Sequence, residues 1–228
     1  MTIAKGRTDC ESEREIIVQG FNDLLRVLKD AKRQTEEHVK SALYDIINDN
    51  TLSDEERWTQ MKPFNDLLSE QEETDIRIRR NILIGLFAFW ELSLKEVCEY
   101  YKLDIAKVKE EKQKKKKESQ KDEPHYTEND YLKAIFHTER LEKIDVISSK
   151  IKQLRNYMTH GSAGEKRRNI IDNLMALHPE YCIARNCGGY HISSYNGLDC
   201  ILMDICNGLQ IAEKEAKTTA ESNKSRKI

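Results

Sequence analysis

Glycine and proline are scarce in this chain of 228 residues, which contains nine glycines and three prolines. Together they make up about 5% of the residues, whereas an average protein contains about 12%. A β sandwich or barrel needs more turn-forming residues than this, so the composition favours long helices. We therefore predict an all-α fold.

Long apolar runs and a strong excess of one charge are also absent. The longest apolar stretch, residues 82–90, is nine residues long and contains Gly85, whereas a membrane span needs about 18. The N-terminus lacks the apolar core of a signal peptide, so we expect a cytoplasmic protein without a membrane partner. The chain contains 38 Lys and Arg and 40 Asp and Glu, so its charges nearly balance. Any contact with nucleic acid must therefore come from a local basic patch.

Cysteine is present, but its spacing indicates neither a disulfide framework nor a metal site. Without a secretion signal, we expect the six cysteines to be reduced thiols. Cys182, Cys187, Cys200, Cys206 and His191 could supply zinc ligands, but their spacing differs from the usual C-x2-C pairs. Phosphate-binding glycine loops and common hydrolase motifs are missing as well. The sequence therefore predicts no metal and no cofactor.

The first 70 residues form a predicted N-terminal helical part. Apolar residues at helical spacing from Ser12 to residue 47 predict one long helix or a helix pair, and residues 48–50 interrupt it. Ser53 followed by Glu56 is typical of a capping box. Pro63 then predicts a kink, or a helix start close to that residue.

Residues 71–216 form the predicted main domain. Residues 74–104 are apolar almost all round in their first turns, which is typical of a central buried helix. Residues 107–123 contain one apolar residue, and they are either a solvated spacer or an arm that contacts phosphates. That charged insert contains the candidate RNA-binding residues, which are Lys114, Lys115, Lys116 and Lys117.

The rest of the main domain contains a helix that bears the candidate site. Apolar residues from 141 to 158 recur in steps of three and four, and Gly161 is placed to end that helix. A shorter helix over 170–177 follows, and then a small hairpin near 181–194, with Gly188 and Gly189 at its turn. A final helix covers 198–212, and residues 217–228 form a predicted loose tail.

Residues 151–161, IKQLRNYMTHG, contain the side chains with the clearest chemistry. Leu154 and Met158 belong to the apolar seam, so Arg155 and His160 flank it. These two residues lie about 140° apart on an ideal helix, although the long arginine and the last turn could bring them to one cleft edge. A guanidinium beside an imidazole suits phosphate-ester chemistry.

The sequence RNYMTH at 155–160 resembles the R-N-x-x-x-H form of the R-x4-6-H motif of HEPN domains (higher eukaryotes and prokaryotes nucleotide-binding). As in that family, the motif ends a long amphipathic helix. The helix before it resembles the family's earlier core helix, in which an acidic residue follows an aromatic one, here Glu91 after Trp90. The resemblance covers roughly residues 74–215. The H-x-Y extension of some toxin members is absent, because Gly161 and Ser162 follow the histidine.

This resemblance implies an all-α bundle that dimerises through its motif helices. It also implies a metal-independent endoribonuclease with a toxin or antiphage defence role, with RNA as substrate and an antitoxin or defence protein as partner. In that scheme Arg155 stabilises the phosphorane charge, His160 transfers or positions a proton, and Asn156 orients the reacting groups. Glu91 holds Arg155 or His160 in place.

Other interpretations of the same residues remain open at this point. A HEPN-like domain that does not catalyse a reaction would bind RNA, a nucleotide or a partner protein. A purely structural helical scaffold would bind no nucleic acid. In that case His160 would only cap helix carbonyls, and Arg155 would form a surface ion pair.

Overall fold

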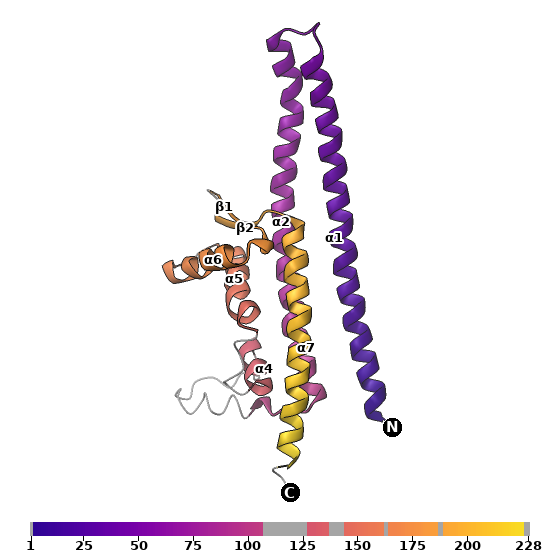
Figure 1. The fold of residues 1–228 in the computed structure, drawn as a ribbon, viewed down its shortest axis with the longest axis vertical. Coiled ribbons are helices and arrows are strands. Elements are labelled where there is room, and N and C mark those ends of the chain that lie inside the picture. The colour runs from indigo at the N-terminus through magenta and orange to yellow at the C-terminus, as the bar shows by residue number, and fades with distance from the viewer. Residues whose placement is uncertain (1, 107–126, 137–143, 162–163, 187–188, 226–228) are drawn as a thin grey trace.

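The computed structural model describes residues 2–106, 127–136, 144–161, 164–186 and 189–225, and most of them are helical (Figure 1). The prediction of an all-α fold with a small hairpin is confirmed by the helices and strands of the described residues. The helices are α1 (Thr2–Asn48), α2 (Asp54–Tyr100), α4 (Glu128–Ile135), α5 (Lys152–His160), α6 (Glu165–Leu177) and α7 (Tyr195–Ser225), and the antiparallel strands are β1 (Ile183–Asn186) and β2 (Gly189–Ile192).

Helices α1 and α2 form a long antiparallel hairpin that extends well beyond the other elements (Figure 1). The capping box at the start of α2 is confirmed, because the Glu56 amide donates to Ser53 Oγ (3.3 Å) and the Ser53 amide donates to Glu56 Oε2 (2.9 Å). Helix α2 continues through Pro63 to Tyr100 and so joins two predicted helices. Helix α1 begins at Thr2, ten residues before the predicted start at Ser12.

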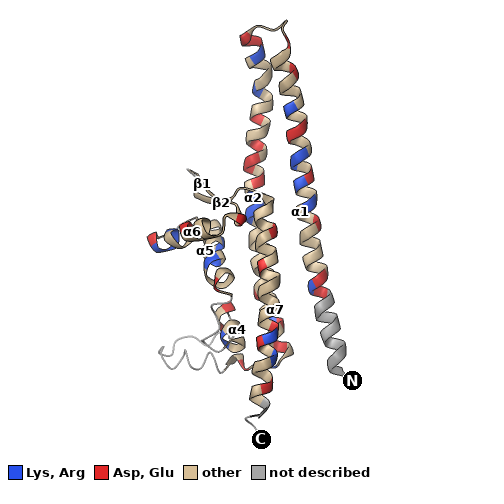
Figure 2. Ribbon diagram, in the orientation of Figure 1, with Lys and Arg blue, Asp and Glu red and all other residues tan. Residues whose placement is uncertain are grey.

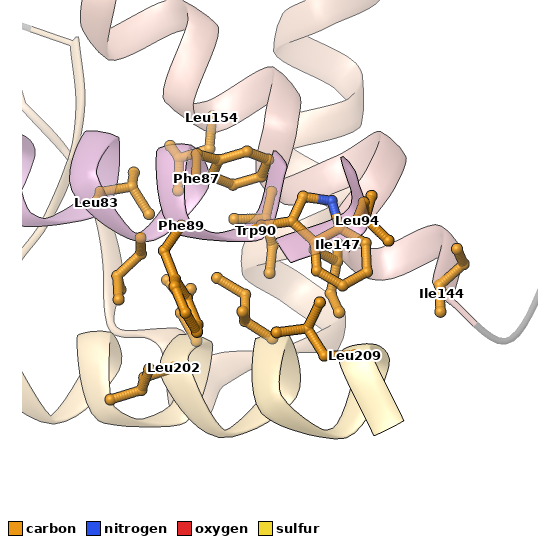
Figure 3. Packing of buried hydrophobic residues seen from close by; sticks show 14 of the residues in the cluster. Leu83, Phe87, Phe89, Trp90, Leu94, Ile144, Ile147, Leu154, Leu202 and Leu209 are labelled. Carbon is orange, nitrogen blue, oxygen red and sulfur yellow. The ribbon is translucent and has the colours of Figure 1, made fainter. Parts of the chain in front are cut away.

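The core surrounds the second half of α2. Trp90 is fully buried there, among apolar side chains of the π-helix Val146–Ile151, α5 and α7 (Figure 3). Burying each large apolar side chain contributes about 1.5–3 kcal/mol. Gly208 permits the close approach of α7, because a Cβ at this position would lie 2.6 Å from Ile147 Cδ1 and 3.2 Å from Trp90 Cζ3.

A partly buried polar network joins the base of the α1–α2 hairpin to the start of α7. Tyr195 Oη donates to Asp75 Oδ1 at 2.8 Å, and Arg79 Nη2 donates to Glu72 Oε1 at 2.6 Å. Lys32 Nζ lies 2.8 Å from Glu72 Oε2 and 3.2 Å from Asp75 Oδ2. Burial, followed by the hydrogen bond to Asp75, raises the pKa of Tyr195, so this hydroxyl remains a donor. The network therefore fixes α1, α2 and α7 at one point.

Helix α7 extends past residue 216, where the sequence predicted a loose tail. It remains helical to Ser225, and Thr219 Oγ1 donates to the carbonyl oxygen of Ile135 in α4 at 3.1 Å. The polar composition of this segment suggested disorder, but one side of it packs against α4. No helix in the described part of the chain is both long and apolar enough to cross a membrane.

Charge is unevenly distributed along the chain (Figure 2). Residues 36–75, which form the distal part of the α1–α2 hairpin, contain twelve Asp and Glu but three Lys and Arg. Residues 152–186, from α5 to β1, contain six Lys and Arg but three Asp and Glu. A local basic region therefore exists in a chain whose net charge is −2.

Candidate functional site

The candidate site begins where a π-helix changes into α5. The predicted apolar seam is buried at Ile144, Ile147, Ile151, Leu154 and Met158, but the backbone is not one regular α-helix. Residues 146–151 form a π-helix, and the Lys152 amide lies within hydrogen-bonding reach of the carbonyl oxygen of Ile147, five residues earlier. Short π-helical turns occur often at functional sites. The wider turn sets the rotation at which α5 begins.

Arg155 lies on the side of α5 that faces α2. Its Nη2 atom donates to Glu91 Oε1 at 3.4 Å, and its guanidinium carbon lies 5.3 Å from the centre of the Phe87 ring. Arg155 is 20% exposed, whereas Glu91 is 41% exposed. Arg155 Nε is buried and has no hydrogen-bond partner among the described residues. The structure therefore brings two of the predicted site residues together at the solvent boundary.

His160 lies at the exposed end of α5, away from that contact. Gly161 ends the helix with φ = 68°, and its amide donates to the carbonyl oxygen of Tyr157 at 2.8 Å. Since α5 is helical through His160, Arg155 and His160 project about 140° apart, and no contact joins them within the described part of the chain. Asn156 is partly exposed and lies one turn before His160. Within one chain, the arginine and the histidine of the motif therefore lie apart from each other.

Helix α6 and the hairpin hold the other side of α5. Arg167 Nε donates to Gln153 Oε1 at 3.0 Å. Tyr157 packs edge-on against Tyr190, with 5.3 Å between ring centres. Gly189 has φ = 105°, and a Cβ there would lie 1.8 Å from Tyr157 Oη. This close approach requires glycine, because the left-handed backbone and the lack of space both exclude a larger residue.

A buried contact near the motif was missed by sequence reasoning. Glu128, in the first turn of α4, accepts a hydrogen bond from Trp90 Nε1 at 2.8 Å and another from Lys152 Nζ. The residue is 2% exposed. Thr127 and Asp130 form a capping box at the start of this helix, and that pattern is visible in the sequence. However, an acidic residue in a first helical turn is usually solvated, so the sequence held no signal of its burial.

The four predicted RNA-binding lysines, Lys114, Lys115, Lys116 and Lys117, fall in a segment that the structure does not describe. Cys187 also lies outside the described residues. Among the residues that the structure describes, no group of three or more His, Cys, Asp or Glu is placed to hold a metal ion.

The chain matches no protein-family model, no curated protein and no solved structure. The assignment of the candidate site therefore depends on the chemistry of its residues and on the resemblance of its motif to that of HEPN domains.

Proposed function

We propose that this protein is a metal-independent endoribonuclease of the HEPN type, which acts as a homodimer in a toxin or antiphage defence role. The observation that carries the proposal is the placement of the motif. Arg155 pairs with Glu91 at the edge of the core, and His160 is exposed at the glycine-capped end of the same helix. Both groups are accessible to a bound phosphate, because neither is fully buried.

The proposed reaction needs only these polar groups and the RNA. The 2′-oxygen attacks the adjacent phosphorus while the P–O5′ bond breaks, which gives a 2′,3′-cyclic phosphate and a 5′-hydroxyl. The 2′-hydroxyl loses its proton to a base, and the leaving 5′-oxygen gains one. In this scheme Arg155 stabilises the phosphorane charge, His160 transfers protons and Asn156 orients the reacting groups. Glu91 positions the guanidinium.

A second copy would complete the site. Because Arg155 and His160 diverge within one chain, a two-fold axis beside α5 would place each histidine near the arginine of its partner. Asn156, Thr159 and His160 are partly or fully exposed, so this face of α5 is open to such a contact. Residues 152–186, which include α5, contain six Lys and Arg but three Asp and Glu, and this basic excess favours contact with RNA by this part of the chain.

The test is RNA cleavage in excess EDTA, with 3′-end analysis of the products. We expect cleavage of RNA but not of DNA of the same sequence, because DNA has no 2′-hydroxyl. Arg155→Ala and His160→Ala should abolish most activity, whereas His38→Ala, which changes an exposed histidine on α1, should retain it. Unchanged cleavage by the Arg155→Ala/His160→Ala variant would contradict the proposal.

The alternative is a HEPN-like module that binds RNA, a nucleotide or a partner protein without turnover. The Arg155–Glu91 pair favours it, because a carboxylate beside the guanidinium offsets part of its charge. Fluorescence anisotropy with labelled RNA separates the two functions. Salt-sensitive binding of intact RNA that requires Arg155, with no product after prolonged incubation, would support the module.

A further inference from the structure

Helices α2, α4 and α5 meet at one buried carboxylate that the proposed chemistry does not use. Trp90 Nε1 and Lys152 Nζ both donate to Glu128, from α2 and α5 respectively. We propose that Glu128 and Lys152 are positioning residues, which fix the rotation of α5 on α2 and thereby hold Arg155 at Glu91. The expected effect on cleavage depends on the proposed function, but the positioning itself does not.

The positions of these residues in sequence link the two contacts. Trp90 immediately precedes Glu91 on α2, and Lys152 precedes Arg155 by three residues, which is close to one turn of α5. The Glu128 contacts therefore link α2 to α5 through α4, and on both α2 and α5 they lie within one turn of the Arg155–Glu91 pair. A rotation of α5 that breaks one contact also moves the other.

The backbone at this point leaves the rotation of α5 open to such an influence. Lys152 is the first residue of α5, and it follows the π-helix directly. Successive residues of a regular α-helix are rotated by 100° about the helix axis. A π-helical turn contains more residues, so the contacts that fix this turn also determine the rotation of the helix that follows it. The ion pair at Lys152 acts at this junction, with its carboxylate fully buried and its lysine 21% exposed.

Energetics separate positioning from simple support of the fold. A buried ion pair contributes little net stability compared with neutral residues that fill the same space, whereas removal of one partner leaves an unpaired buried charge and is costly. Lys152→Met should therefore destabilise the protein. Lys152→Met/Glu128→Gln should recover stability, because no buried charge remains and the carbonyl oxygen of the introduced amide can still accept from Trp90. The double variant should therefore differ from wild type mainly in the geometry that the ion pair sets.

The experiment compares these two variants with Lys152→Arg, in the full chain. Lys150→Met is the matched control, since Lys150 is two residues away and its Nζ lies 3.9 Å from Oδ2 of the half-exposed Asp145. The probe is the side-chain Nε–H NMR signal of Arg155, assigned by its loss in Arg155→Lys. Urea midpoints report stability, and kcat and KM for RNA cleavage report the chemistry.

We expect Lys152→Met/Glu128→Gln to unfold at nearly the wild-type midpoint but to show a shifted Arg155 signal. Its kcat should fall by about tenfold or more with little change in KM, because small displacements of a catalytic group cost this much. Lys152→Arg keeps the positive charge, so it should retain the wild-type Arg155 signal and kcat. Lys150→Met should also match wild type in both measurements.

A wild-type Arg155 signal in the double variant would overturn the positioning role, whether or not any RNA is cleaved. A shifted signal in a protein whose wild type cleaves no RNA would support positioning and refute the nuclease proposal. If Lys152→Met fails to fold, the double variant and Lys152→Arg still decide between these outcomes.

Discussion

Replacement of Arg155 and of His160 by alanine should remove similar amounts of activity but different amounts of stability. Each substitution should lower the rate of RNA cleavage by about a hundredfold or more, the usual cost of losing a general acid–base group or a transition-state contact. The difference in stability follows from what each side chain touches in the folded chain.

The free energy of unfolding can be compared from these contacts. Arg155 forms a partly exposed ion pair with Glu91, which is worth about 0.2–1 kcal/mol. Its guanidinium also lies over the Phe87 ring, which adds about 0.5–1 kcal/mol. Arg155→Ala should therefore cost about 1–2 kcal/mol, or about 2–8 °C in melting temperature for a chain of this size. His160 is exposed, and His160→Ala should stay within about 0.5 kcal/mol of wild type.

Thermal unfolding by circular dichroism and cleavage in EDTA, measured on the same preparations, would check both quantities. A loss of more than about 4 kcal/mol in the free energy of unfolding for Arg155→Ala would show that the residue supports the core. A loss of cleavage by this variant could then not be attributed to a catalytic role of Arg155. Full activity of Arg155→Ala in a folded protein would refute the assignment of charge stabilisation to this residue.

Three further predictions concern the scaffold and the charged insert. Gly197→Ala should lower the free energy of unfolding by about 1–3 kcal/mol, because its Cβ would lie 2.1 Å from the carbonyl oxygen of Tyr181, and a lower urea midpoint would show this. Gly20→Ala is the control, since a Cβ there meets nothing within 4 Å, and it should raise the free energy of unfolding by about 0.5–1 kcal/mol. Burial raises the pKa of Cys98 to about 12, so the unfolded thiol releases its proton first as pH rises. Stability should therefore fall above about pH 9 by up to about 1.4 kcal/mol per pH unit, and urea unfolding from pH 8 to 10.5 should show a shallower fall for Cys98→Ala. Replacement of Lys114–Lys117 by alanine should weaken RNA binding and flatten its dependence on salt; an unchanged salt slope in anisotropy titrations would exclude contact with phosphates by these lysines.

Features set by local sequence were predictable. The capping boxes at Ser53 and Thr127, the helix end at Gly161 and the hairpin near 181–194 all depend on residues a few positions apart. Pro63 is the exception, because α2 continues through it. Helix α1 runs beside α2 along this stretch (Figure 1), and a local pattern cannot identify that neighbour.

Features set by tertiary partners could not be predicted in this way. The steps of three and four before Met158 fit a regular helix, so they gave no sign of the π-helix at 146–151. The proximity of Arg155 and Glu91 was expected from the resemblance alone. The burial of Glu128 depends on Trp90 and Lys152, which lie 38 and 24 residues away, and no spacing rule connects them.

The length of the α1–α2 hairpin affects how the protein unfolds. Beyond the network at Asp75 and Tyr195, the two helices are paired only with each other over the described residues 33–74 (Figure 1), and only Val39 is fully buried there. With so little apolar burial, this part should open locally at a much lower free energy than the core. Its amide hydrogens should exchange with deuterium early, while those around Trp90 remain protected, so the hairpin should melt as a separate cooperative unit before the rest of the molecule.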